Sequence, residues 1–322
     1  MGKKVQSSVG VFSLLFLVAA VFHSAIAQHQ HTSQKVTSGK GILLLAHGGS
    51  EQWNEEVNKL AGVVNKTTAT EVAFGMATKR NIQAAIDRLI ARGVREIVAV
   101  PLFVSSHSSV ITSTQYLLGV RKEAPAELAI YAKMDHGHGG HENHRAGMSE
   151  PAIDPTTPVL SSVPIRMTSA LDRHFIVSDI LFSRARSISN KPKSEVVIVV
   201  AHGPVSDQEN VKWLGDMSAL VKQMTKKGGF KRVEYMTVRD DAPEPLRSQA
   251  TAELRKMVER ATGENNQVLI VPLLLSYGGI EEGVKKRLQG LNYTMCKQAL
   301  LPDNRLADWV LSSADVRRTD KP

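Results

Sequence analysis

Continuous apolar runs alternate with amphipathic segments along most of this chain. The run at 41–46 ends in His47, Gly48 and Gly49, and residues 51–64 after it have helical periodicity. An unbroken apolar run that is bounded by glycine is typical of a buried parallel strand at the start of a βα unit. The pattern therefore predicts parallel sheets covered by helices, the α/β fold class.

The same alternation of strands and helices continues to the end of the chain. In the first half we predict further strands at 70–76, 96–104, 127–133 and 165–171, and helices at 81–92, 112–122 and 175–187. In the second half we predict strands at 196–201, 232–238 and 267–275, and helices at 208–225, 246–261 and 280–289.

The second half repeats the first. An apolar strand followed by Ala-His-Gly returns at 195–203, residues 271–277 match 100–106, and residues 299–314 match 170–185. Three matching segments in the same order indicate a tandem duplication, with domains at 41–190 and 194–316. In this alignment His202 corresponds to His47, whereas Gly278 takes the position of His107, so the second half lacks the second histidine.

The first 27 residues have the features of a secretory signal. Lys3 and Lys4 precede an apolar run at 9–22, and Ala25-Ile-Ala27 offers a cleavage site. We expect cleavage after Ala27, a flexible polar leader at 28–40, and export to a periplasm. A retained membrane anchor is the alternative, because the run is marginally long enough to span a bilayer. No other stretch is apolar enough, so we expect no stable membrane span after cleavage.

The composition of the chain limits which classes of ligand the mature protein is expected to bind. Cys296 is the only cysteine, so no intramolecular disulfide can form. The net charge of +9 favours anionic ligands. Nucleic acid is not expected, since aromatic residues make up 5% of the chain and do not interleave with basic runs. The chain also has no phosphate-binding loop of the Gly-x-x-x-x-Gly-Lys-Ser/Thr type and no dinucleotide fingerprint, so we expect no nucleotide.

Two groups of histidines are candidates for metal chemistry. His47 and His107 each follow a predicted strand at the carboxyl edge of one sheet, where open α/β sheets bind ligands. Two imidazoles can hold a divalent transition metal with open coordination positions, or accept protons near neutral pH. The second group lies in a Gly- and Pro-rich insertion at 135–164, for which we predict a metal-binding tract; a polar linker is the alternative. It consists of His136, His138, His141 and His144.

The motifs around these histidines resemble a known family. Leu-Leu-Leu-Ala-His-Gly-Gly-Ser at 43–50, Val-Pro-Leu-Phe-Val at 100–104 before His107, and Ala-Leu-Asp-Arg-His-Phe-Ile-Val-Ser-Asp-Ile-Leu at 170–181 are similar to the sirohydrochlorin chelatase family (CbiX/SirB). These are class II tetrapyrrole chelatases, which use no ATP. The resemblance implies two tandem flavodoxin-like domains facing each other across a cleft.

The resemblance also implies an activity, the insertion of Co2+ or Fe2+ into sirohydrochlorin or a related tetrapyrrole. His47 and His107 match the two active-site histidines of the family, which bind the metal and take the pyrrole protons. Sirohydrochlorin is rich in carboxylates, which gives the basic charge a partner. We consider Lys79, Arg80 and Arg239 as contacts for these carboxylates, with solvated surface charges as the alternative.

Two other functions fit the same features. A periplasmic metal or haem carrier with a chelatase-derived fold would share the signal, the basic charge and the histidine tract. A duplicated structural domain is the third alternative. The sequence leaves open the metal, the tetrapyrrole, the oligomeric state and the role of His202.

Overall fold

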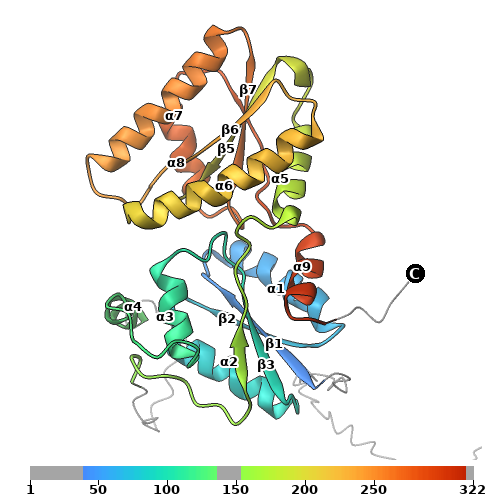
Figure 1. Cartoon of the computed structure of the whole chain (residues 1–322), viewed down its shortest axis with the longest axis vertical. Coiled ribbons are helices and arrows are strands. Elements are labelled where there is room, and N and C mark those ends of the chain that lie inside the picture. The colour runs from blue at the N-terminus through green and yellow to red at the C-terminus, as the bar shows by residue number, and fades with distance from the viewer. Residues whose placement is uncertain (1–38, 136–153, 317–322) are drawn as a thin grey trace, which may run out of the picture. The chain divides into compact units, whose positions relative to one another are not determined.

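Two four-stranded parallel sheets organise the described part of the chain (Figure 1). The computed structural model describes residues 39–135 and 154–316, which belong to one compact unit. The first sheet has the order β2-β1-β3-β4 and the second the order β6-β5-β7-β8. The strands are β1 (Lys40–Ala46), β2 (Ala69–Phe74), β3 (Glu96–Pro101), β4 (Ile165–Met167), β5 (Glu195–Ala201), β6 (Arg232–Thr237), β7 (Gln267–Leu273) and β8 (Thr294–Met295). This arrangement confirms the predicted α/β class with two parallel sheets.

After their first residues, the interior strands β1, β3, β5 and β7 are apolar, because helices cover both faces of each sheet. Every residue of β5 is buried, and in β1 only Lys40 is not. The helices are α1 (Glu51–Asn65), α2 (Lys79–Ala91), α3 (Ser109–Leu117), α4 (Leu128–Asp135), α5 (Phe175–Ser187), α6 (Asp207–Lys227), α7 (Leu246–Gly263), α8 (Ile280–Arg287) and α9 (Arg305–Ser313), with a 3-10 turn, η1 (Pro192–Ser194), before β5.

Serine side chains set where three of these helices begin. Ser50, Ser108 and Ser206 precede α1, α3 and α6, and each side-chain oxygen accepts a backbone N–H from the first turn. Such a cap satisfies one of the backbone donors that a helix start leaves free. The start of each helix, directly after the edge of a sheet, is therefore encoded locally.

Three sequence predictions need correction. The strand predicted at 127–133 is wrong, because this segment forms α4. Leu128 and Ala132 are the buried positions there, and a spacing of four residues puts both on one face of a helix. The predicted strands 96–104 and 165–171 are shorter than expected and end at Pro101 and Met167.

We call the half of the chain with the first sheet the first repeat and the half with the second sheet the second repeat, after the duplication that the sequence predicts. The last helix of each half packs on the other half. Helix α5 follows the first sheet but packs against α6 and β7, whereas α9 follows the second sheet and packs against α1. Figure 1 shows both pairs of neighbours. One apolar core consequently includes residues of both repeats, such as Val57 of α1, Val177 of α5 and Trp309 of α9.

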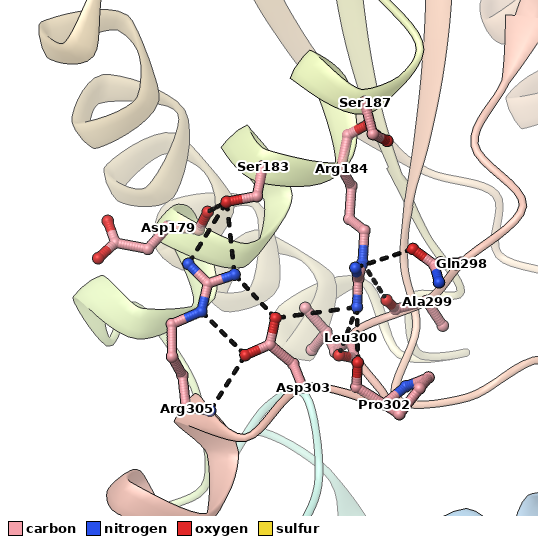
Figure 2. Close-up of polar contacts among 10 residues, drawn as sticks. All are labelled: Asp179, Ser183, Arg184, Ser187, Gln298, Ala299, Leu300, Pro302, Asp303 and Arg305. Carbon is pink, nitrogen blue, oxygen red and sulfur yellow. Dashed lines mark hydrogen bonds and ion pairs between the residues drawn. The ribbon is translucent and has the colours of Figure 1, made fainter.

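Arg184, whose side chain is 12% exposed, fastens α5 to the segment before α9 (Figure 2). The guanidinium of Arg184 donates to the carbonyl oxygens of Ala299, Leu300 and Pro302 at 2.9, 3.3 and 3.0 Å. It also lies 3.9 Å from the carboxylate of Asp303, which accepts hydrogen bonds from Arg305. Burial alone would raise the pKa of Asp303, but these hydrogen bonds and the two positive charges lower it. These contacts hold α5, which follows the first sheet, against the second repeat.

Helix α5 begins with a histidine cap that depends on pH. The Nδ1 atom of His174 accepts the backbone N–H of Ile176 at 3.3 Å, which only the unprotonated nitrogen can do. Burial lowers the pKa of His174 below its ordinary value of 6.5. A lowered pKa means that the stability this residue contributes is present above the unfolded-state pKa and is lost as pH falls toward the folded-state pKa.

We expect His174→Asn to remove this pH dependence. Asparagine also caps helices but does not titrate, whereas loss of the cap costs about 1 kcal/mol. Urea unfolding of the wild type and the variant, compared at pH 7 and on the acid side of the ordinary histidine pKa of about 6.5, measures the effect. The wild type should lose more stability than the variant on acidification; equal losses would rule out this role for His174.

The first 38 residues lie outside the described part of the chain, and with them the predicted signal and most of the leader. Within the described ranges, none of the helices combines the length and the apolar character that a membrane crossing requires.

Candidate functional site

Two histidines lie at the carboxyl edge of the first sheet. His47 directly follows β1, and His107 lies in the loop between β3 and α3. Strands β1 and β3 are paired in parallel, with Leu45 opposite Pro101, so both segments leave the sheet at the same edge. The side chain of His47 is exposed, and its Nδ1 lies 2.7 Å from the carbonyl oxygen of Gly48. An accessible imidazole at this edge is placed to meet a ligand from solution.

A carboxylate fixes the loop that carries His107. Asp172 accepts hydrogen bonds from the backbone N–H of Ser106 at 2.6 Å and from its hydroxyl at 2.8 Å. Ser105 is buried, and its hydroxyl oxygen accepts the backbone N–H of His107 at 3.1 Å. Sequence reasoning did not single out Asp172, although it lies in the motif at 170–181 on which the family resemblance rests. That motif and the loop of His107 form one structure.

Helix α6 of the second repeat completes the surroundings of His107. The indole Nε1 of Trp213 donates to the carbonyl oxygen of His107 at 2.8 Å. The imidazole Nε2 of His107 lies 3.5 Å from Oδ2 of Asp216, whose side chain is 14% exposed. This oxygen has no hydrogen-bond partner within the described ranges. A buried carboxylate thus faces the imidazole from the other repeat.

Asp216 lies in surroundings that favour its protonated form. Burial raises its pKa, and the negative charge of Asp172 raises it further, while His107 and Arg173 act in the opposite direction. A carboxylate beside an imidazole stabilises the imidazolium that forms when the ring accepts a proton. The pair of His107 and Asp216 can therefore take up a proton within the protein.

Glu209 is a second acid of α6 that interacts with this loop. Burial raises the pKa of Glu209, and the neighbouring Glu127 raises it further. Lys212, His107 and a backbone hydrogen bond from Ser109 act in the opposite direction. The hydroxyl of Tyr131 in α4 lies 2.6 Å from the Ser109 hydroxyl. Two acidic side chains of α6, Glu209 and Asp216, therefore lie near the imidazole of His107.

The three candidate cations differ in accessibility. Lys79 is buried, and its Nζ donates to the carbonyl oxygen of Asp154 at 2.9 Å and to Thr157 Oγ1 at 2.5 Å. Arg239 is buried too; it pairs with Asp207 at 2.6 Å and donates to the carbonyl oxygens of Pro204 and Val205. Both cations are already bound by the protein, so neither is open to a substrate carboxylate in this structure.

Arg80 differs from the other two, because its side chain is exposed at the start of α2, after β2. It lies next along the chain to the buried Lys79 and is the candidate cation that solvent reaches. The four histidines of the tract, His136, His138, His141 and His144, lie outside the described residues.

The matching edge of the second sheet carries different side chains. His202 follows β5, as His47 follows β1, and its Nε2 lies 3.2 Å from Oδ2 of Asp241. Gly278 stands where the first repeat has His107, and a Cβ atom added there would lie 3.5 Å from Cδ1 of Trp53. In each repeat the loop after the third strand therefore meets the first helix of the other repeat.

Comparison with known proteins agrees with this architecture. The CbiX family model matches residues 41–188. The structure of SirB from Bacillus subtilis with Fe3+ superimposes with a TM-score of 0.56 at 15% identity, covering 86% of this chain and 94% of SirB. DR2241 from Deinococcus radiodurans, a multi-domain protein with structural similarity to chelatases, gives a TM-score of 0.50 at 16% identity, covering 88% of this chain and 56% of DR2241.

No curated protein matches the chain significantly. The two structural likenesses, at these identities, concern the fold, and the similarity to the CbiX family is confined to the matched segment. That segment contains His47, His107 and Asp172. Residues 41–188 of this chain thus match the CbiX family model, and the fold resembles that of SirB.

Proposed function

We propose that this chain inserts a divalent transition metal, Co2+ or Fe2+, into sirohydrochlorin or a related carboxylate-rich tetrapyrrole without a nucleotide. One observation carries the proposal: the segment that matches the CbiX family contains two histidines that leave paired strands at one edge of the first sheet. Metal insertion needs a ligand that presents the ion to the ring and a base that accepts the two pyrrole protons.

In this proposal the two histidines share these tasks. His47, which is exposed, binds the incoming metal and leaves coordination positions open for the pyrrole nitrogens. His107 takes part in binding the metal and accepts protons. Asp216 acts as a positioning residue, because its carboxylate faces the His107 imidazole at 3.5 Å and stabilises the ring when it is protonated.

Other residues would bind the substrate carboxylates and supply the metal. Arg80, which is exposed, would contact a tetrapyrrole carboxylate. The histidine tract at 136–144 would raise the local metal concentration by weak multivalent capture. The signal-like first 27 residues support export, so we propose that the activity belongs to a periplasm.

The experiment is anaerobic incubation of sirohydrochlorin with Co2+ or Fe2+, with and without the chain from Gln28 onward, followed by absorbance. We expect insertion of at least one metal faster than the spontaneous reaction. The carrier alternative predicts tight binding of metal or haem with no increase in rate. Insertion at the spontaneous rate with both metals would contradict the proposal.

A further inference from the structure

The proposed function leaves His202 without a role, although it repeats His47. Two carboxylates lie beside it, those of Asp240 and Asp241 in the segment after β6. One ligand atom from each of these three residues lies within 4.8 Å of the other two. From this juxtaposition we propose a divalent transition-metal site at the carboxyl edge of the second sheet.

The backbone brings these three residues together. After β5 and β6 separate from their last paired residues, Ala201 and Thr237, the two segments remain hydrogen-bonded. The N–H of Val238 donates to the carbonyl oxygen of Ala201 at 2.9 Å, and that of Arg239 donates to His202 at 2.7 Å. Because Arg239 has a φ of 50°, the chain turns here, and Asp240 and Asp241 follow directly.

A glycine allows the close approach of the two segments. Gly203 has a φ of 75°, and a Cβ atom at this position would lie 2.5 Å from Cβ of Thr237. Only glycine fits this turn without displacing β6. The glycine after His202 thus permits the contact between the two segments that brings the carboxylates of Asp240 and Asp241 close to His202.

The first repeat has the same backbone contact but different side chains. There, the N–H of Gly75 donates to the carbonyl oxygen of Ala46 at 2.9 Å, so Gly75 corresponds to Val238. Counting onward, Ala77 and Thr78 stand where the second repeat has Asp240 and Asp241. The first edge thus offers two histidines, whereas the second offers one histidine and two carboxylates.

The donor set suits a borderline divalent ion. Imidazole nitrogen and carboxylate oxygen together bind Mn2+, Fe2+, Co2+ and Zn2+, and three protein ligands leave coordination positions open. His202 Nε2 and Asp241 Oδ2 are 3.2 Å apart, with exposed side-chain fractions of 29% and 70%. An ion can therefore reach the site from solution.

An arginine orients the third ligand. Arg287 pairs with Oδ1 of Asp240 at 2.5 Å, and its Nε donates to Thr251 at 3.0 Å. A carboxylate has two oxygens and can accept from an arginine while it binds a metal. Asp240 also lines a cavity of about 500 Å³ that is lined by Arg247, Arg255 and Lys286 as well. Space and positive charge for an anionic co-ligand lie beside the proposed metal.

The test is a His202→Cys variant of the full chain, titrated with Co2+ alone under anaerobic conditions. A thiolate that ligates Co2+ gives a ligand-to-metal charge-transfer band in the near ultraviolet. We expect this band in the variant. The wild type should lack it, because its cysteine, Cys296, is 2% exposed. No tetrapyrrole is needed, so the result is independent of the proposed function.

The matched control keeps the same thiol and removes the acids. We expect the band to be lost or strongly weakened when His202→Cys is combined with Asp240→Asn and Asp241→Asn. In the otherwise wild-type chain, Asp241→Asn should raise the Kd of Co2+ at this site at least about 10-fold. Its carboxylate is largely exposed, so this variant should fold normally. No band at saturating Co2+, or an unchanged band in the triple variant, would overturn the inference.

Discussion

Replacing His47 by alanine is expected to lower the rate of metal insertion at least about 10- to 100-fold, because the loss of a mere outer-shell partner of a metal ligand already costs this much and His47 is the proposed ligand itself. The side chain is exposed and makes its one described hydrogen-bond contact with the adjacent Gly48, so its loss should not affect folding. The measurement is the initial rate of Co2+ or Fe2+ insertion into sirohydrochlorin at saturating metal, with thermal unfolding as the check on folding.

His174→Asn is the matched control for this variant. It also removes an imidazole, but at the start of α5, where the ring caps a helix. We expect its insertion rate to equal that of the wild type at neutral pH. If His47→Ala also kept the wild-type rate, the edge of the first sheet would not be the site of insertion.

Replacing Arg184 by methionine is expected to lower the free energy of unfolding by about 3–5 kcal/mol, the range observed when one partner of a buried charged network is removed. Methionine keeps an apolar stem, but the buried carbonyl oxygens of Ala299 and Leu300 lose their donor. An unsatisfied buried acceptor is costly because water cannot replace the lost bond. Urea unfolding, followed by circular dichroism, measures the change.

Arg305→Met tests whether burial causes the effect. Arg305 pairs with the same carboxylate, that of Asp303, but its side chain is 37% exposed, against 12% for Arg184. We expect a loss of about 1 kcal/mol, as for partly exposed ion pairs. Equal losses of unfolding free energy in the two variants would contradict the view that Arg184 fastens α5 to the second repeat.

Local pattern was sufficient for most of the secondary structure. Strand β5 is buried along its whole length, and a run of this kind was recognisable because both faces of the sheet are covered. Helix α5 has the bounds 175–187 that its periodicity predicted. The strand predicted at 127–133 is wrong because a short apolar run fits a strand and a helix equally well. In the structure Leu128 and Ala132 are the buried residues of this segment, and their spacing of four puts both on one face of the helix.

Nothing in the sequence predicts that α5 and α9 each pack on the other repeat. Both helices bury apolar side chains, but an apolar surface does not specify which sheet it covers. The same limit applies to the site. The edge that holds His47 and His107 followed from strand alternation, whereas Asp216 meets His107 only through the packing of α6 from the other repeat.

Whether a candidate cation is open to a substrate also depends on its contacts in the fold, and its position in the sequence does not reveal these contacts. The sequence makes Lys79 and Arg239 candidates because each follows a strand at the ligand edge. Arg239 pairs with Asp207 and donates to carbonyl oxygens before α6, while Lys79 is bound by Asp154 and Thr157. Asp172 could have been found, because it lies in the motif at 170–181 that the resemblance already used.

The most direct test of chelatase activity is the number of turnovers. Sirohydrochlorin and metal are supplied in large excess over the chain from Gln28 onward, and the amount of metallated product is divided by the amount of protein after subtraction of the spontaneous reaction. We predict many product molecules per chain, formed at a rate proportional to protein concentration. Product that stops at one molecule per chain, or that does not exceed the spontaneous reaction, would contradict catalysis and would identify a binding protein instead.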